Sequence, residues 1–130
     1  MKLTGYILAI FTFSFCSTEI PIKKIEIKKV DFEINTVFRI DCNDFENSFK
    51  KELKSIIVTD KLTIQKFEQE LTMLQIDTGS YNPDVRAKLL IHYSDTRIDT
   101  LCMSEIGFLL NGKSFLSNEE LLNLVRNVKK

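Results

Sequence analysis

The sequence has few of the residues on which common catalytic and cofactor sites depend. It contains a single histidine, His92, so a multi-histidine metal site cannot be built, and it lacks both the Cys-x-x-Cys and the His-Glu-x-x-His spacing. Its four glycines, at positions 5, 79, 107 and 112, are too scattered to form a phosphate-binding loop. We therefore expect no metal site, no cofactor and no catalytic residues in a recognised pattern.

An excess of charge of one sign is also absent. The 130 residues include 18 lysines and arginines and 18 aspartates and glutamates, so no overall field would draw the protein onto nucleic acid or an anionic membrane. With four glycines and two prolines in a chain that is 44% hydrophobic, the composition is that of a globular protein rather than a disordered or fibrous one. We expect a single domain and no nucleic-acid partner.

The first seventeen residues differ from the rest of the chain. Lys2 precedes an uncharged apolar run over residues 6–15, which has the length of a signal-peptide hydrophobic region and falls short of the about 20 apolar residues of a membrane span. No second hydrophobic span follows Glu19. We therefore expect residues 1–17 to be a cleaved export signal and residues 18–130 to form the single mature domain. A retained anchor and a buried first strand are the alternatives.

The fate of Cys16 depends on how that signal is cleaved. A lipoprotein signal has a small residue before the modified cysteine and an aliphatic residue three positions before it, and Phe15 and Phe13 occupy these places. Ser14 with Cys16, or Cys16 with Thr18, could instead supply the small residues of an ordinary cleavage site. Cys16 is therefore either acylated, which would give a lipid anchor, or discarded. Both outcomes predict a location in the periplasm or cell envelope.

Export also decides how the two remaining cysteines, Cys42 and Cys102, are interpreted. In an oxidising compartment they could pair, and the disulfide would restrict the unfolded chain by about 4 kcal/mol on the chain-entropy model. In the alternative, both are buried small hydrophobic residues without a covalent bond. The sequence does not decide between the two, because it does not place the two Cα atoms within bonding reach.

Apolar residues in the first half alternate with polar ones and then recur at helical spacing. Ile25 and Ile27 begin a pattern of period two that continues over residues 30–40, which predicts one long half-buried strand with a bulge at Lys28-Lys29. Asp41 is placed to cap a helix, and a second helix follows Asp60. The two helical stripes consist of Phe45, Phe49, Leu53 and Ile56, and of Ile64, Phe67, Leu71 and Leu74. A loop over residues 77–83 ends this half.

The second half has the pattern of a β-meander followed by a helix. Alternation over residues 85–93, a turn at 94–96 and a strand at 97–103 precede two apolar segments at 106–110 and 113–116. These segments flank Asn111-Gly112, a strong hairpin signal, because both central residues of a type I′ turn need positive φ. Ser117 and Glu120 form a capping box before a last leucine-rich helix.

Together these patterns predict an α+β domain of two layers. The antiparallel sheet would consist of the long N-terminal strand and the C-terminal β-meander, and two or three helices would pack against it.

The region from about residue 56 to 128 resembles small exported proteins and lipoproteins of Gram-negative bacterial envelopes. The resemblance lies in an aspartate-to-cysteine stretch at residues 99–102, an Asn-Gly-Lys turn at 111–113 and the leucine-rich helix at 121–125. It also includes the segment Ile-Val-Thr-Asp at 57–60, ahead of a short amphipathic helix. The resemblance implies the same fold and export, and it implies no established activity.

Two enzyme hypotheses can be built from the residues present. Cys42 at a helix N-terminus could be a thiolate nucleophile with His92 as its base, but His92 alternates with Lys88 on the polar side of a strand, which predicts an exposed sheet histidine. The second hypothesis is a catalytic pair of carboxylates. Aspartates at helix caps and in turns also have purely structural roles, which explain the same residues without catalysis. The candidate carboxylates are Asp41, Asp44, Asp95 and Asp99. The segment 95–99 also lacks the ligand density of a calcium loop.

Binding hypotheses agree better with the sequence. The polar residues of the first strand form either a solvated edge or a docking edge for an added strand, and Tyr81 in the 77–83 loop is either a contact tip or part of a capping loop. The polar residues are Lys23, Lys24, Glu26, Lys28 and Lys29. We therefore expect a non-enzymatic envelope module that binds an unidentified protein. A periplasmic inhibitor or immunity-type protein is the alternative, and a small cysteine or carboxylate hydrolase ranks below both. The oligomeric state is left open.

Overall fold

The computed structural model describes residues 19–79 and 82–130, which form one sheet and three helices. In chain order the elements are β1 (Ile22–Lys29), α1 (Phe45–Ser48), β2 (Lys54–Val58), α2 (Lys61–Thr72), β3 (Ala87–Tyr93), β4 (Ile98–Met103), β5 (Gly107–Leu110), β6 (Lys113–Leu116) and α3 (Glu119–Asn127). All strand pairs are antiparallel, in the order β2-β1-β3-β4-β5-β6. The predicted α+β class, with helices packed on an antiparallel sheet, is confirmed.

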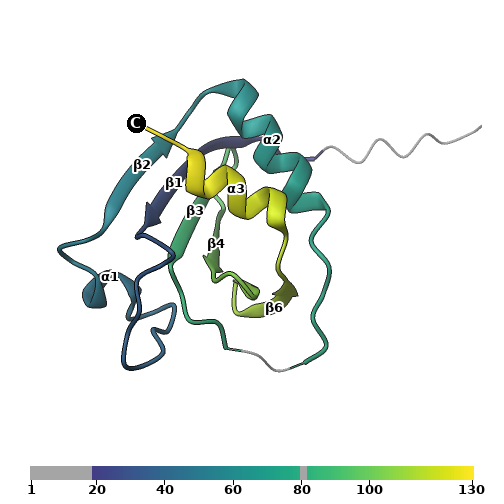
Figure 1. The fold of residues 1–130 in the computed structure, drawn as a ribbon. Coiled ribbons are helices and arrows are strands. Elements are labelled where there is room, and N and C mark those ends of the chain that lie inside the picture. The colour runs from purple at the N-terminus through teal and green to yellow at the C-terminus, as the bar shows by residue number, and fades with distance from the viewer. Residues whose placement is uncertain (1–18, 80–81) are drawn as a thin grey trace, which may run out of the picture.

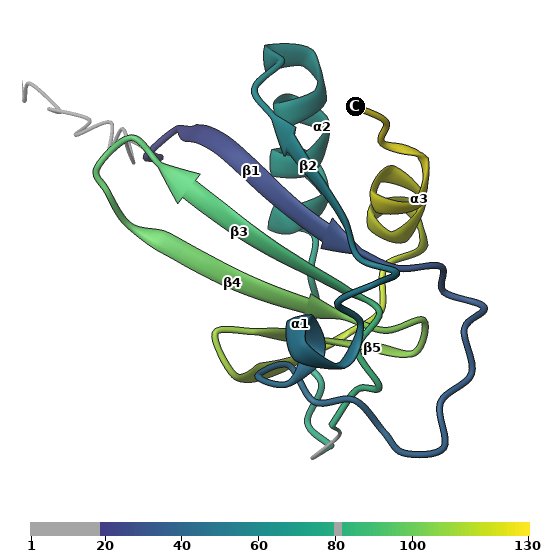
Figure 2. The same ribbon diagram turned by 90° about the vertical axis from the view of Figure 1, so that its left-hand side faces the viewer.

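The two longer helices, α2 and α3, lie side by side against one face of the sheet (Figures 1 and 2). Because side chains alternate along a strand, every second residue of the central strands points at these helices. The fully buried residues between the sheet and the helices include Ile25, Ile27, Leu89, Leu101, Met103, Phe67 and Leu121. This layer is the main core of the domain.

The opposite face of the sheet carries a second, smaller core at one end. There Phe45 of α1 and Phe49, the residue that follows this helix, pack with Val85 and Cys102. The two phenylalanine rings meet edge to face, with their centroids 5.6 Å apart. Farther along the same face Ile57 is 62% exposed, so the sheet there meets solvent.

The prediction that the first strand continues over residues 30–40 is wrong. β1 ends at Lys29, and the chain continues as a loop, in which Arg86 donates a hydrogen bond from its Nε to the Ile34 carbonyl (3.1 Å). Val37 and Phe38, at 93% and 79% exposure, do not follow a two-residue burial pattern. Alternation alone does not make a strand, because a strand also needs a partner with free backbone groups.

The bulge expected at Lys28-Lys29 is also misplaced, since the register shift of β1 lies between Ile22 and Lys24.

The first predicted helix is shorter than its stripe indicated. Only α1, four residues long, is helical, and Leu53 and Ile56 belong to the approach to β2 and to β2 itself. Asp44, not Asp41, holds the N-cap position, without a side-chain hydrogen bond. The β-branched run from Ile56 to Val58 favours a strand, and Ile56 pairs with Ile27 in β1 to bury its side chain.

The elements that local signals define agree with the sequence, apart from the residue that caps α3. Asp60 caps α2 by accepting a hydrogen bond from the Thr63 N–H (2.9 Å). Asn111 and Gly112 have φ of +49° and +80° in the β5–β6 turn, as the hairpin signal requires. The cap of α3 is Asn118 rather than Ser117, because the Asn118 side chain accepts from the Leu121 N–H (3.1 Å).

Candidate binding site

The outer side of β2 exposes backbone groups that the sheet does not use. β2 is an edge strand, at the left-hand margin of the sheet in Figure 1. The Val30 N–H, just after β1, donates to the Arg86 carbonyl (3.0 Å). Backbone groups of successive residues in a strand point to opposite sides, so the even-numbered residues of β1 form their backbone hydrogen bonds with β3. The odd-numbered residues of β1 form theirs with β2. In β2, the partners of these odd-numbered residues are Lys54, Ile56 and Val58, so their backbone groups point toward β1. The N–H and C=O groups of Ser55 and Ile57 therefore point outward, away from the sheet.

The two edges of the sheet differ in how they are covered. In residues 19–79 and 82–130, no hydrogen bond reaches the outward backbone groups of β2. At the other edge, the Leu116 N–H donates to the Gln75 carbonyl (2.8 Å), and the Asp77 N–H donates to the Ser114 carbonyl (3.1 Å). The segment after α2 therefore covers β6, whereas β2 stays open. An open edge is a template for another strand.

The side chains around β2 give this edge a basic character. Ile57 lies on the open face, whereas Ile56 and Val58 are buried beneath the helices. The exposed charged residues from position 50 to 61 are Lys50, Lys51, Glu52, Lys54, Asp60 and Lys61. Thr63 donates its hydroxyl and its N–H to the Asp60 carboxylate, and these bonds lower the pKa of Asp60. With four lysines against two carboxylates, the edge favours an acidic partner.

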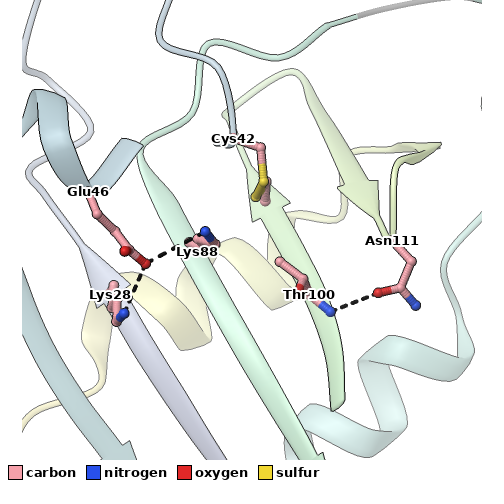
Figure 3. The surroundings of a disulfide bond; sticks show 7 residues. Lys28, Cys42, Glu46, Lys88, Thr100 and Asn111 are labelled. Carbon is pink, nitrogen blue, oxygen red and sulfur yellow. Dashed lines mark hydrogen bonds and ion pairs between the residues drawn. A yellow bond between two sulfur atoms is a disulfide. The ribbon is translucent and has the colours of Figure 1, made fainter. Parts of the chain in front are cut away.

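A disulfide joins Cys42 to Cys102 on the same face of the sheet (Figure 3). The two Cα atoms are 5.8 Å apart, and Cys102 is fully buried in β4. The bond ties the loop before α1 to a central strand. Of the two alternatives that the sequence left open for these cysteines, the structure has the disulfide.

Glu46 of α1 contacts two lysines beside this disulfide. Figure 3 shows its carboxylate between Lys28 of β1 and Lys88 of β3, at 2.9 Å and 3.6 Å from their Nζ atoms. The hydrogen bond from Lys28 is the main reason that the pKa of Glu46 is lowered, and the charge of Lys88 adds to it. The contact holds α1 against the open face of the sheet.

The residues of the cysteine-hydrolase hypothesis do not form a nucleophile and base here. Cys42 has no free thiol in the disulfide form, so it supplies no thiolate. The His92 side chain is only 20% exposed, less than the sequence indicated, and its Nε2 lies 3.6 Å from Glu26 Oε1. Within the described residues this Nε2 has no hydrogen-bond partner.

The candidate carboxylates each have a local structural role, and three of the four accept a hydrogen bond. Asp41 accepts from Arg39 Nε (3.2 Å), Asp44 holds the N-cap position of α1, and Asp95 accepts from the Arg97 N–H (3.1 Å) in the β3–β4 turn. Asp99 accepts from the Tyr93 hydroxyl (2.9 Å). Across the part of the chain that the structure describes, no group of three histidine, cysteine or acidic residues could hold a metal ion.

The polar residues of the first strand form neither of the two alternatives given for them, a solvated edge or a docking edge. β1 lies between β2 and β3 and has no free edge. Lys29 is 8% exposed, and its Nζ donates to the carbonyls of Val125, Arg126 and Val128 at the end of α3, at 2.7, 2.8 and 3.0 Å. Sequence reasoning missed the real edge because residues 54–56 were assigned to a helix. The signal that could have identified it is the β-branched run of residues 56–58.

Two predicted features lie outside the described residues. They are Cys16 with the export signal, and Tyr81. None of the described helices is long and apolar enough to cross a membrane.

Comparisons with protein-family models, with curated proteins and with solved structures found no match to this chain. The resemblance to exported envelope proteins therefore remains a prediction from the sequence, and the geometry of the site carries the functional argument.

Proposed function

We propose that this chain is an exported envelope protein that binds a partner protein by adding an extended segment of the partner to β2. The observation that carries the proposal is the open outer side of β2, whereas the chain's own segment covers β6 at the opposite edge of the sheet. Strand addition gives affinity through main-chain hydrogen bonds and specificity through alternate side chains. No catalytic group is needed for it.

The surroundings of β2 define the chemistry of the partner segment. Its backbone would bond to the N–H and C=O of Ser55 and Ile57. One apolar side chain would cover Ile57, which is the exposed hydrophobic residue of this strand. Acidic residues at the flanks would meet Lys51 and Lys54. A second copy of this chain fits less well, because it would bring another lysine-rich edge against this one.

Two features support the exported location. The charge and apolar run of residues 1–17 have the pattern of a secretory signal. The disulfide between Cys42 and Cys102 supports export as well, because such bonds persist in oxidising compartments and are rare in reducing ones. A domain with a disulfide and an open binding edge suits an envelope interaction module.

Site-specific photo-crosslinking in the cells that make the protein tests this proposal. A photoreactive residue replaces Ile57 in the full chain, and the matched control carries it at Leu116 on the covered edge. Both positions are exposed hydrophobic residues of edge strands. We expect a discrete adduct with another protein at Ile57 and none at Leu116.

Three results would contradict the proposal: no adduct at Ile57, equal adducts at both positions, or an adduct of two copies of this chain. A second variant, Ser55→Pro, removes an outward N–H without removing a β1 hydrogen bond, so it should abolish the adduct while the protein stays folded. If the captured partner is a hydrolase or toxin whose activity falls on binding, the protein is an inhibitor that uses the same edge.

A further inference from the structure

A cleft of about 590 Å³ lies between α2 and the ends of β3, β4 and β5, on the helix-covered side of the sheet. Ile91, which is 1% exposed, forms an apolar floor together with Leu71 and Leu110. The segment just before β1, including Ile20, completes one wall. The volume falls within the range of about 300–1,000 Å³ that small-molecule sites occupy.

The charged groups around this cleft are mainly acidic. Glu19, Glu68 and Asp99 line it, against the single guanidinium of Arg97. The C-terminal end of α2 also borders the cleft, and its last turn has no basic residue. The partial negative charge of a helix C-terminus therefore adds to the two carboxylate charges that Arg97 leaves unbalanced.

Hydrogen bonds hold two of these carboxylates in position. The Tyr93 hydroxyl donates to Asp99 Oδ2 (2.9 Å), and Asn111 Nδ2 donates to Asp99 Oδ1 (3.0 Å). Burial, with the bond to Asp99, raises the pKa of Tyr93 to about 12, so this hydroxyl remains a donor at neutral pH. The Ile22 N–H donates to Glu68 Oε1 (3.3 Å). Each carboxylate keeps acceptor sites for a ligand.

We propose that this cleft binds a small amphipathic amine, with the protonated nitrogen near Glu68 and Asp99 and the apolar part over Ile91. The acidic rim disfavours a fatty acid, which has the same apolar body and the opposite charge. Arg97 lies over the Tyr93 ring, 4.0 Å from its centroid, and is exposed, so it can move away from the entering ligand. The cleft is independent of the β2 edge, because Ile57 points to the other face of the sheet.

An NMR titration of the labelled protein at pH 7 tests this site with n-octylamine as the probe and octanoate as its control. We expect octylamine to shift the amide signals of Leu71, Ile91 and Leu110, and octanoate to bind at least about fivefold more weakly, as expected for one partly exposed charge contact. Octanoate that binds as tightly as octylamine would overturn the proposal, as would shifts confined to residues outside the cleft.

Charge-removing variants assign the binding to this cleft. Glu68→Gln keeps an acceptor for the Ile22 N–H and should weaken octylamine binding about fivefold. Asp99→Asn should have a similar effect and keeps an oxygen for the Tyr93 hydroxyl. The matched control is Glu46→Gln, on the opposite face of the sheet, which should leave the affinity unchanged. Equal affinities for all three variants would overturn the proposal.

Discussion

Glu46 balances charge on the open face of the sheet. Lys28 and Lys88 lie directly opposite each other on β1 and β3, so their ammonium groups would repel without a shared anion. The Glu46 carboxylate contacts both, and it is about 40% exposed, so water screens part of the interaction.

This contact predicts a pH-dependent stability. Because the folded pKa of Glu46 is below its ordinary value of 4.5, the stabilisation is fully present above that value and is lost as the pH falls through the folded pKa. We expect Glu46→Gln to lower the free energy of unfolding by up to about 1 kcal/mol at pH 7. At a pH well below the folded pKa, the variant should match the original protein.

Urea unfolding at the two pH values measures this difference. The control is Glu33→Gln, which removes an exposed carboxylate from the loop after β1 and should have little effect at either pH. If Glu46→Gln lowered the free energy of unfolding by the same amount at both pH values, the result would contradict the ion contacts of Glu46 with Lys28 and Lys88.

The elements of this fold differ in how far the sequence predicts them. α2 and the β5–β6 hairpin follow from signals within a few residues: the Asp60 cap, the helical stripe and the Asn111-Gly112 turn. β1 and β2 depend on their partners. Residues 30–40 alternate like a strand and form a loop, whereas residues 54–56 fall within a helical stripe and belong to the edge strand. Whether these segments become strands depends on pairing with residues far away in the sequence, and local periodicity gives no information about such pairing.

The prediction that Lys29 belongs to an outward polar edge is also wrong, although the phase of this lysine in the sequence indicates the correct orientation. It is in phase with Ile25 and Ile27, so it points toward the helices. There its Nζ donates to three carbonyls at the end of α3, which a helix otherwise leaves unpaired. Burial, with the nearby charge of Lys54, lowers the pKa of Lys29.

Replacing this lysine should loosen α3. Lys29→Met keeps the apolar stem and removes the donors, so we expect the free energy of unfolding to fall by about 1–3 kcal/mol. Thermal or urea unfolding measures the change, and amide exchange in α3 should accelerate. Lys24→Met, on the opposite face of the same strand, is the matched control and should cost less than about 1 kcal/mol. Equal losses in the two variants would show that the α3 contact adds nothing.

The disulfide links the two halves of the chain. It closes a sequence separation of 60 residues, from the loop before α1 to β4 in the meander. The bond and the Glu46 contacts together hold α1 and its loop on the sheet face next to the open edge.

Reduction should therefore destabilise the protein and release α1 first. A loop of this length corresponds to about 4 kcal/mol on the chain-entropy model. We expect a lower urea midpoint after reduction and alkylation, with faster amide exchange in α1 than in α2 or β3. The Cys42→Ala, Cys102→Ala double variant should behave like the reduced protein. An unchanged midpoint after complete reduction would contradict this role of the bond.

Amide hydrogen exchange in β2 shows whether a partner strand is added at this edge. It is measured by NMR in the protein alone and in the complex with the partner captured at Ile57. We predict that the Ser55 and Ile57 amides exchange rapidly in the free protein and at least about tenfold more slowly in the complex, whereas the Leu116 amide is protected in both. Ser55 and Ile57 amides that are already protected in the free protein, or that exchange equally fast in the complex, would contradict the account.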